Sequence, residues 1–139
     1  MKKFFLFLSL FGALLEASQI EWHKDYTSAH EASVQKEQIL LVFVTTDDCK
    51  FCKKLKNETF LSPEIIERIS QSYQSVEVNE QRDTYPKALS AKRFPTIYFL
   101  TPEEEIIDYT LGYYNVEDFG YILNAAEYRY KKMKPFYKE

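Results

Sequence analysis

The chain has 139 residues but contains only three glycines, two cysteines and two histidines. The scarcity of glycine, together with the lack of internal repeats and low-complexity tracts, leaves no flexible linker, so one domain is expected. A zinc site needs four ligands, and only His23 and His30 could join the two sulfurs, without any paired spacing. A c-type haem site would need histidine directly after the second cysteine, where Lys53 stands. We therefore expect no metal and no bound cofactor.

The chain also lacks an excess of positive charge and a long hydrophobic segment. Its formal net charge is −3, which gives no indication of nucleic-acid binding. Residues 4–15 are apolar apart from one serine and one glycine, but this run is shorter than the roughly 20 residues that span a bilayer. Lys2 and Lys3 precede the run and Leu15-Glu16-Ala17 follows it, a pattern typical of a secretory signal peptide.

The expected processing defines the domain and its compartment. Cleavage after Ala17 would remove a signal peptide over residues 1–17 and leave a soluble, periplasmic domain over residues 18–139. An uncleaved anchor is the alternative. No cysteine precedes Cys49, which excludes lipoprotein-type attachment at the signal junction, and no other stretch is apolar enough to suggest stable membrane insertion.

Both cysteines lie in Cys49-Lys50-Phe51-Cys52, shortly after the apolar run of residues 39–44. That run indicates a strand buried on both faces of a sheet, and residues 53–60 lack proline and glycine and indicate a helix. The cysteines therefore lie at a helix N-terminus, where free amide groups and the helix dipole favour a thiolate. A purely structural disulfide between these cysteines would close a loop of about four residues and would stabilise the fold by only roughly 2 kcal/mol. A redox-active pair is favoured over a metal site or an inert staple.

The rest of the chain predicts alternating helices and strands. Ser62-Pro63 is a typical helix start, and Asn115 with Asp118 predicts the cap of the final helix. A mixed central sheet with helices on both faces, an α/β fold, follows from this order. The expected strands are residues 20–23, 39–44, 75–79, 96–100 and 105–111, and the expected helices are residues 26–36, 50–60, 62–72, 85–92 and 115 onward. Three tyrosines are expected to pack on these elements, and three lysines to form a solvated helix face: Tyr109, Tyr121, Tyr130, Lys53, Lys54 and Lys56.

Pro95, in Arg93-Phe94-Pro95-Thr96, opens the strand at residues 96–100. With the apolar strand, the cysteine pair and Leu111-Gly112-Tyr113 before the last helix, the chain resembles the thioredoxin family, and specifically the exported thioredoxin-like proteins of bacteria. The resemblance implies a thioredoxin-like fold and a cis Pro95 packed against the dithiol. It also implies that the backbone beside Pro95, at Phe94 and Thr96, pairs with an extended stretch of substrate.

The chain departs from the family pattern near the cysteines. Many thioredoxins carry a buried acid six residues before the first cysteine, whereas Phe43 stands there in this chain. Asp48 replaces the usual aromatic residue, and Lys-Phe replaces Gly-Pro between the cysteines. We expect Lys50 to lower the pKa of Cys49, and Asp47 and Asp48 to raise it.

These observations predict an exported thiol–disulfide oxidoreductase that exchanges disulfides with protein or peptide substrates. Cys49 is the expected attacking thiolate, and Cys52 the thiol that resolves the mixed disulfide. Electrons would be exchanged with another protein, for which a membrane-bound thiol carrier is the expected partner. A reductant or isomerase is favoured over a strong oxidant, because the stretch from Cys52 to Pro95 has no room for the large helical insertion of the oxidase branch. The alternative is a non-catalytic, peptide-binding or chaperone-like module, and Phe43 in place of the acid favours it.

Overall fold

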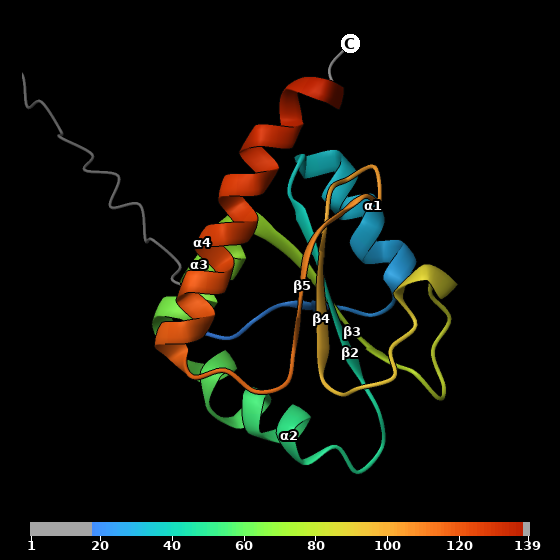
Figure 1. Cartoon of the computed structure of the whole chain (residues 1–139), viewed down its shortest axis with the longest axis vertical. Coiled ribbons are helices and arrows are strands. Elements are labelled where there is room, and N and C mark those ends of the chain that lie inside the picture. The colour runs from blue at the N-terminus through green and yellow to red at the C-terminus, as the bar shows by residue number, and fades with distance from the viewer. Residues whose placement is uncertain (1–17, 138–139) are drawn as a thin grey trace, which may run out of the picture.

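The structure, a computed structural model, describes residues 18–137, so the predicted signal peptide lies outside the described residues. Its centre is a five-stranded sheet in the order β1-β3-β2-β4-β5 (Figure 1). The first three strands run parallel to one another, and the last two form an antiparallel hairpin beside β2. The mixed sheet predicted from the sequence is thereby confirmed. Its strands are β1 (Trp22–His23), β2 (Ile39–Thr45), β3 (Tyr73–Asn79), β4 (Thr96–Leu100) and β5 (Ile106–Leu111).

Helices cover both faces of this sheet, as predicted. Figure 1 shows α1 on one side, α3 and α4 on the other, and α2 near the end of β2. Within the described residues, no helix is long and apolar enough to cross a membrane. The helices are α1 (Tyr26–Lys36), α2 (Lys50–Asn57), α3 (Pro63–Ser72) and α4 (Val116–Met133).

The central strand β2 divides the core into two clusters. All seven of its residues are buried, because neighbouring strands pair on both edges and helices cover both faces. Leu40 and Val42 face α1, whereas Leu41 and Phe43 face the side of α2, α3 and α4. The strand therefore ends at a fixed position beneath the first turn of α2, where the cysteines lie.

One predicted helix was wrong. Residues 85–92 contain only the 3-10 turn Lys87–Leu89. Pro86 directly precedes that turn, and proline disfavours a helical conformation in the residue before it. The Glu80 carboxylate also accepts hydrogen bonds from the Ser90 hydroxyl and the Ala91 N–H. The Ala91 N–H therefore bonds to a side chain and not to a backbone carbonyl of a helix. The chain therefore reaches β4 through an irregular segment.

Smaller corrections concern helix ends. The helix expected over residues 50–60 ends at Asn57, and a 3-10 turn, Thr59–Leu61, follows it. Pro63 opens α3 as predicted, but in the described structure the Ser62 side chain makes no capping hydrogen bond. Asn115 does cap α4, since its side-chain oxygen accepts from the Asp118 N–H at 2.9 Å.

Two of the three tyrosines expected to pack are exposed. Tyr130 is buried on the apolar stripe of α4, but Tyr121 lies outside that stripe and is 64% exposed. Tyr109 is 58% exposed, because α1 packs over β2 and β3 and leaves β5 at an open edge. For Tyr109 and Tyr121 the expectation of packing was wrong.

Candidate functional site

Cys49 and Cys52 are joined by a disulfide at the start of α2. Cys49 is the N-cap residue, and its sulfur accepts a hydrogen bond from the Cys52 N–H at 3.1 Å. Its carbonyl accepts from the Lys53 N–H at 3.2 Å, the first backbone bond of the helix. A negative charge on this sulfur after reduction would lie at the positive end of the helix dipole, next to an amide donor.

The two cysteines differ in their exposure to solvent. Cys52 is only 4% exposed and belongs to the larger core cluster, whereas Cys49 is half-buried at the edge of that cluster. The difference arises because the N-cap lies outside the helix, while Cys52 lies within the first turn and faces β2. The arrangement is suited to a pair in which one sulfur meets a partner molecule and the other stays shielded.

The loop between β2 and Cys49 carries two acidic side chains with different surroundings. The Asp47 carboxylate accepts hydrogen bonds from the Arg82 guanidinium at 2.8 Å and the Asn79 amide at 3.0 Å. Asp48 is exposed and has a left-handed backbone (φ 57°), a conformation that aspartate tolerates better than most residues. Lys50 is exposed on the first turn of α2. The effects of Asp48 and Lys50 on the pKa of Cys49 stay predictions, since a disulfide does not titrate.

The far end of α2 is attached to the segment between β5 and α4. The Tyr113 hydroxyl donates to the Glu58 carboxylate at 2.6 Å, and this hydrogen bond raises the pKa of Tyr113. The Lys54 ammonium lies 4.3 Å from the centre of the Tyr113 ring, a cation–π contact. The Thr59 hydroxyl donates to the Tyr114 carbonyl. These contacts hold the helix that carries both cysteines against the rest of the domain.

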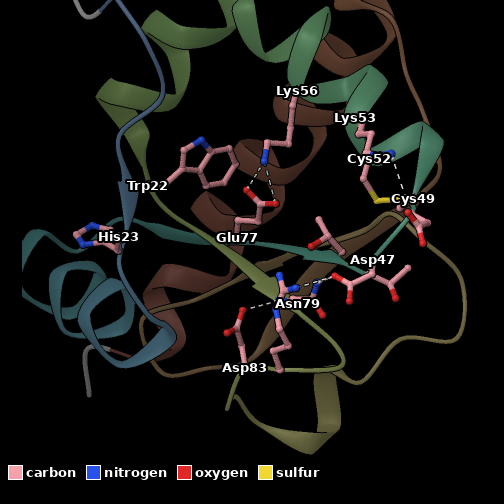
Figure 2. A pocket seen from close by; sticks show the side chains of 14 residues that line it. Trp22, His23, Asp47, Cys49, Cys52, Lys53, Lys56, Glu77, Asn79 and Asp83 are labelled. Atoms are coloured by element: carbon pink, nitrogen blue, oxygen red, sulfur yellow. Dashed lines mark hydrogen bonds and ion pairs between the residues drawn. A yellow bond between two sulfur atoms is a disulfide. The ribbon is translucent and has the colours of Figure 1, made fainter.

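A cleft of about 430 Å³ opens beside the disulfide (Figure 2). Both cysteines line it, and Trp22 of β1 lies on the opposite side. The Lys56 ammonium donates to the two Glu77 carboxylate oxygens, at 3.1 and 2.9 Å. The remaining lining residues are His23, Thr45, Thr46, Asp47, Asp48, Lys53, Asn79, Arg82 and Asp83.

Phe43, at the position where the resemblance led us to look for an acid, is fully buried. Its ring lies 5.2 Å from that of Phe60 and 5.8 Å from that of Trp22, centre to centre. Glu77 is the register partner of Phe43 on β3 and has a side chain only 30% exposed. A carboxylate is therefore present in this cleft, one strand away from the position expected in the family.

Sequence reasoning missed both members of this ion pair. Lys56 was grouped with Lys53 and Lys54 as part of a solvated face, although it follows Cys52 by four residues and so lies on the same side of α2. Glu77 stands between two valines in β3, and no local pattern connects it with α2. The parallel register of β2 and β3 brings it beneath that helix.

The second part of the predicted site is the segment before β4. The Phe94–Pro95 peptide bond is cis, as the resemblance implied. Thr96 pairs in register with Val44 of β2, and this pairing places Pro95 beside the loop that leads to Cys49. Phe94 and Cys49 pack against the same core cluster. The structure thus brings Pro95 and the cysteines to one end of the sheet.

Part of the backbone near Pro95 is already hydrogen-bonded within the protein. The Pro95 carbonyl accepts from the Gly112 N–H at 2.8 Å, and Thr96 lies between β2 and β5 within the sheet. The Thr96 hydroxyl donates to the Arg93 carbonyl at 2.7 Å. Phe94 is half-buried and precedes β4. Of the two neighbours of Pro95, it is therefore the one that lies outside the strand pairing of the sheet.

The two histidines have structural partners. The His23 ring bonds to the Gln74 side chain at 2.8 Å, and the His30 ring to the Pro102 carbonyl at 2.9 Å. Among the described residues, no group of three or more histidine, cysteine, aspartate or glutamate side chains could hold a metal ion.

Comparison with known proteins gives one family match. Residues 26–127 match the family model of a thioredoxin-like domain. A curated relative, the thioredoxin-related protein DsbJ of Chlamydia pneumoniae, is 38% identical over 80 residues, which are 52% of this chain and 23% of the relative. The aligned part is therefore less than a quarter of that protein.

Solved structures that share the fold include two Dsb proteins. The oxidoreductase DsbH superposes with a TM-score of 0.67 at 20% identity, over 82% of this chain and 89% of the other. The oxidised C-terminal domain of DsbD from Neisseria meningitidis superposes with a TM-score of 0.57 at 14% identity, over 74% of this chain and 90% of that domain.

Proposed function

The chain belongs to the thioredoxin-like family, and from that membership we propose that it is a thiol–disulfide oxidoreductase acting on protein or peptide disulfides. The observation that carries the proposal is the unequal exposure of the two cysteines at the N-terminus of α2. Cys49 is accessible and accepts a helix N–H, whereas Cys52 is 4% exposed behind it. A partner molecule can therefore reach Cys49 first, and Cys52 acts within the molecule.

The proposed reaction has two exchange steps. In the reduced protein, the Cys49 thiolate attacks a sulfur of the substrate disulfide, forms a mixed disulfide and releases one substrate thiolate. Cys52 then loses its proton, attacks the Cys49 sulfur and releases the second substrate thiolate. Two electrons pass to the substrate, whose two thiolates take up protons, and the Cys49–Cys52 disulfide is formed. The same steps in reverse would oxidise a substrate dithiol.

The substrate groove in this proposal lies along Phe94, Pro95 and Thr96. Phe94 offers backbone outside the sheet for pairing with an extended peptide, and Thr96 positions the preceding turn through its bond to the Arg93 carbonyl. The register of Thr96 with Val44 supports a position for this groove near the loop that leads to Cys49.

The compartment of the protein, the direction of electron transfer and the electron partner are also proposals. The leader-like sequence of residues 1–17 supports export to the periplasm. A membrane-bound thiol carrier is the proposed electron partner, because the two exchange steps involve no cofactor and the electrons must therefore be exchanged with another protein. The short segment between Cys52 and Pro95, which here forms the rest of α2, α3, β3 and two 3-10 turns, supports a reductant or isomerase over a strong oxidant.

Insulin reduction by the purified domain tests the proposal. The wild type should catalyse precipitation of insulin chains in the presence of a thiol reductant, and Cys49→Ser should abolish it. Cys52→Ser should accumulate mixed disulfides with envelope proteins, because the resolving thiol is gone, and Cys49→Ser should accumulate almost none.

The second candidate is a non-catalytic peptide-binding module, which the apolar Phe43 position favours. Absence of insulin turnover, with equal trapping by both serine variants or by neither, would select this candidate and overturn the oxidoreductase.

A further inference from the structure

The second exchange step requires a base that the cysteine pair does not contain. A free cysteine has a pKa of about 8.5, so a resolving thiol is mostly protonated at neutral pH and must lose its proton before it attacks. Cys52 is 4% exposed, which restricts exchange with bulk solvent. The cleft of about 430 Å³ that Cys52 lines provides a route for this proton.

Glu77 is placed to receive it. Its side chain enters the cleft from β3 and is held at both carboxylate oxygens by Lys56. Lys56 follows Cys52 by one helical turn, so the helix face that carries the shielded sulfur also carries the residue that fixes the carboxylate. In Figure 2 the Glu77 carboxylate points toward α2, between Trp22 and the cysteines.

The other three acidic groups of the cleft are exposed, whereas Glu77 is half-buried. Asp47 is bonded to Arg82 and Asn79, and the Asp83 carboxylate accepts from the Asn79 N–H at 2.7 Å. Asp48 is exposed in the loop before Cys49. Figure 2 shows Asp83 beyond Asn79, away from the sulfurs. The remaining ionisable groups that line the cleft are His23, Lys53, Lys56 and Arg82.

We infer that Glu77, positioned by Lys56, is the proton acceptor for the Cys52 thiol, through the solvent of the cleft. This inference rests on the proposed function and names the base of its second step. The Cys52 S–H bond breaks and its proton passes to the Glu77 carboxylate. The Cys52 thiolate then forms the bond to the Cys49 sulfur as the substrate thiolate leaves. In the reverse direction the protonated Glu77 returns the proton to Cys52.

The test isolates the second step. Treatment of the reduced protein with a chromogenic aromatic disulfide forms a mixed disulfide at Cys49, and stopped-flow absorbance follows both the first release of the aromatic thiol and the second, caused by Cys52. We expect Glu77→Gln to leave the first release unchanged and to slow the second about 100-fold at pH 7, the low end for a positioned general base. Asp83→Asn, the matched carboxylate control from the same cleft, should leave both rates unchanged.

The pH profile separates proton transfer from a structural effect. The gap between wild type and Glu77→Gln should narrow as the pH rises, because hydroxide can then take the thiol proton without help from a carboxylate. Glu77→Asp keeps a carboxylate and should retain more of the rate at pH 7 than Glu77→Gln, which also covers the case in which Glu77→Gln does not fold.

The outcomes distinguish the inference from the function on which it rests. A slowing that is the same at every pH, an unchanged rate, or an equal loss in Asp83→Asn would overturn the role of Glu77 alone. A wild-type protein that shows no second release would overturn the oxidoreductase itself.

Discussion

Phe43 provides a measurable test of how the site is supported. The side chain is fully buried and packs edge-on against Phe60. It also lies beside Trp22, which lines the cleft. Replacement of a buried phenylalanine by alanine costs about 3–5 kcal/mol, because the apolar surface is lost and the cavity closes only partly. The free energy of unfolding of a typical domain is only about 5–15 kcal/mol, so Phe43→Ala should remove a large share of it.

Urea unfolding of the oxidised protein measures this change. With a urea dependence of about 2 kcal/mol per M, the midpoint should fall by about 1.5–2.5 M. Trp22, the only tryptophan, reports the transition by fluorescence, and circular dichroism provides an independent signal. Phe43→Leu nearly keeps the volume and should cost less than about 1.5 kcal/mol.

The matched control is Tyr121→Ala, an aromatic truncation on the exposed side of α4, which should change stability by no more than about 0.5 kcal/mol. If Phe43→Ala moved the midpoint no further than Tyr121→Ala, the packing described around the cleft would be refuted.

Three further outcomes are expected. Alkylation of the reduced protein at neutral pH, followed by peptide mapping, should label Cys49 before Cys52, because Cys52 is 4% exposed; preferential labelling of Cys52 would reverse the assigned roles. Reduction of the disulfide should change the fluorescence of Trp22, which lines the same cleft, and a variant with both cysteines replaced by serine should show no such change. Burial, and then the charge of Glu127, raise the pKa of Tyr73 above the value of about 10 that it has when unfolded. Because the folded state keeps this proton longer, the corresponding stability is complete below about pH 10 and declines as pH rises further. The melting temperature should therefore fall above pH 10, less steeply in Tyr73→Phe, and equal slopes would contradict the assignment.

The sequence predicted an element correctly wherever the residues that determine this element lie within the same segment. The apolar run before the cysteines predicted β2, and its continuity with Cys49 predicted that the pair begins a helix. Asn115 predicted the start of α4 because a cap bonds to residues within its own first turn. The helix expected over residues 85–92 failed because Pro86 and the distant Glu80 carboxylate offered the backbone other conformations and partners.

The sequence by itself determined the order of the elements, the position of the cysteine pair at a helix N-terminus and the place of Pro95 before β4, since each depends on neighbours along the chain. Only the tertiary structure decided that Thr96 lies between two strands and that Glu77 lies beneath α2 in a bond with Lys56. Those outcomes depend on strand register and on the ion pair between α2 and β3, which join residues far apart in sequence. A carboxylate one strand away from its expected position is visible only when that register is known.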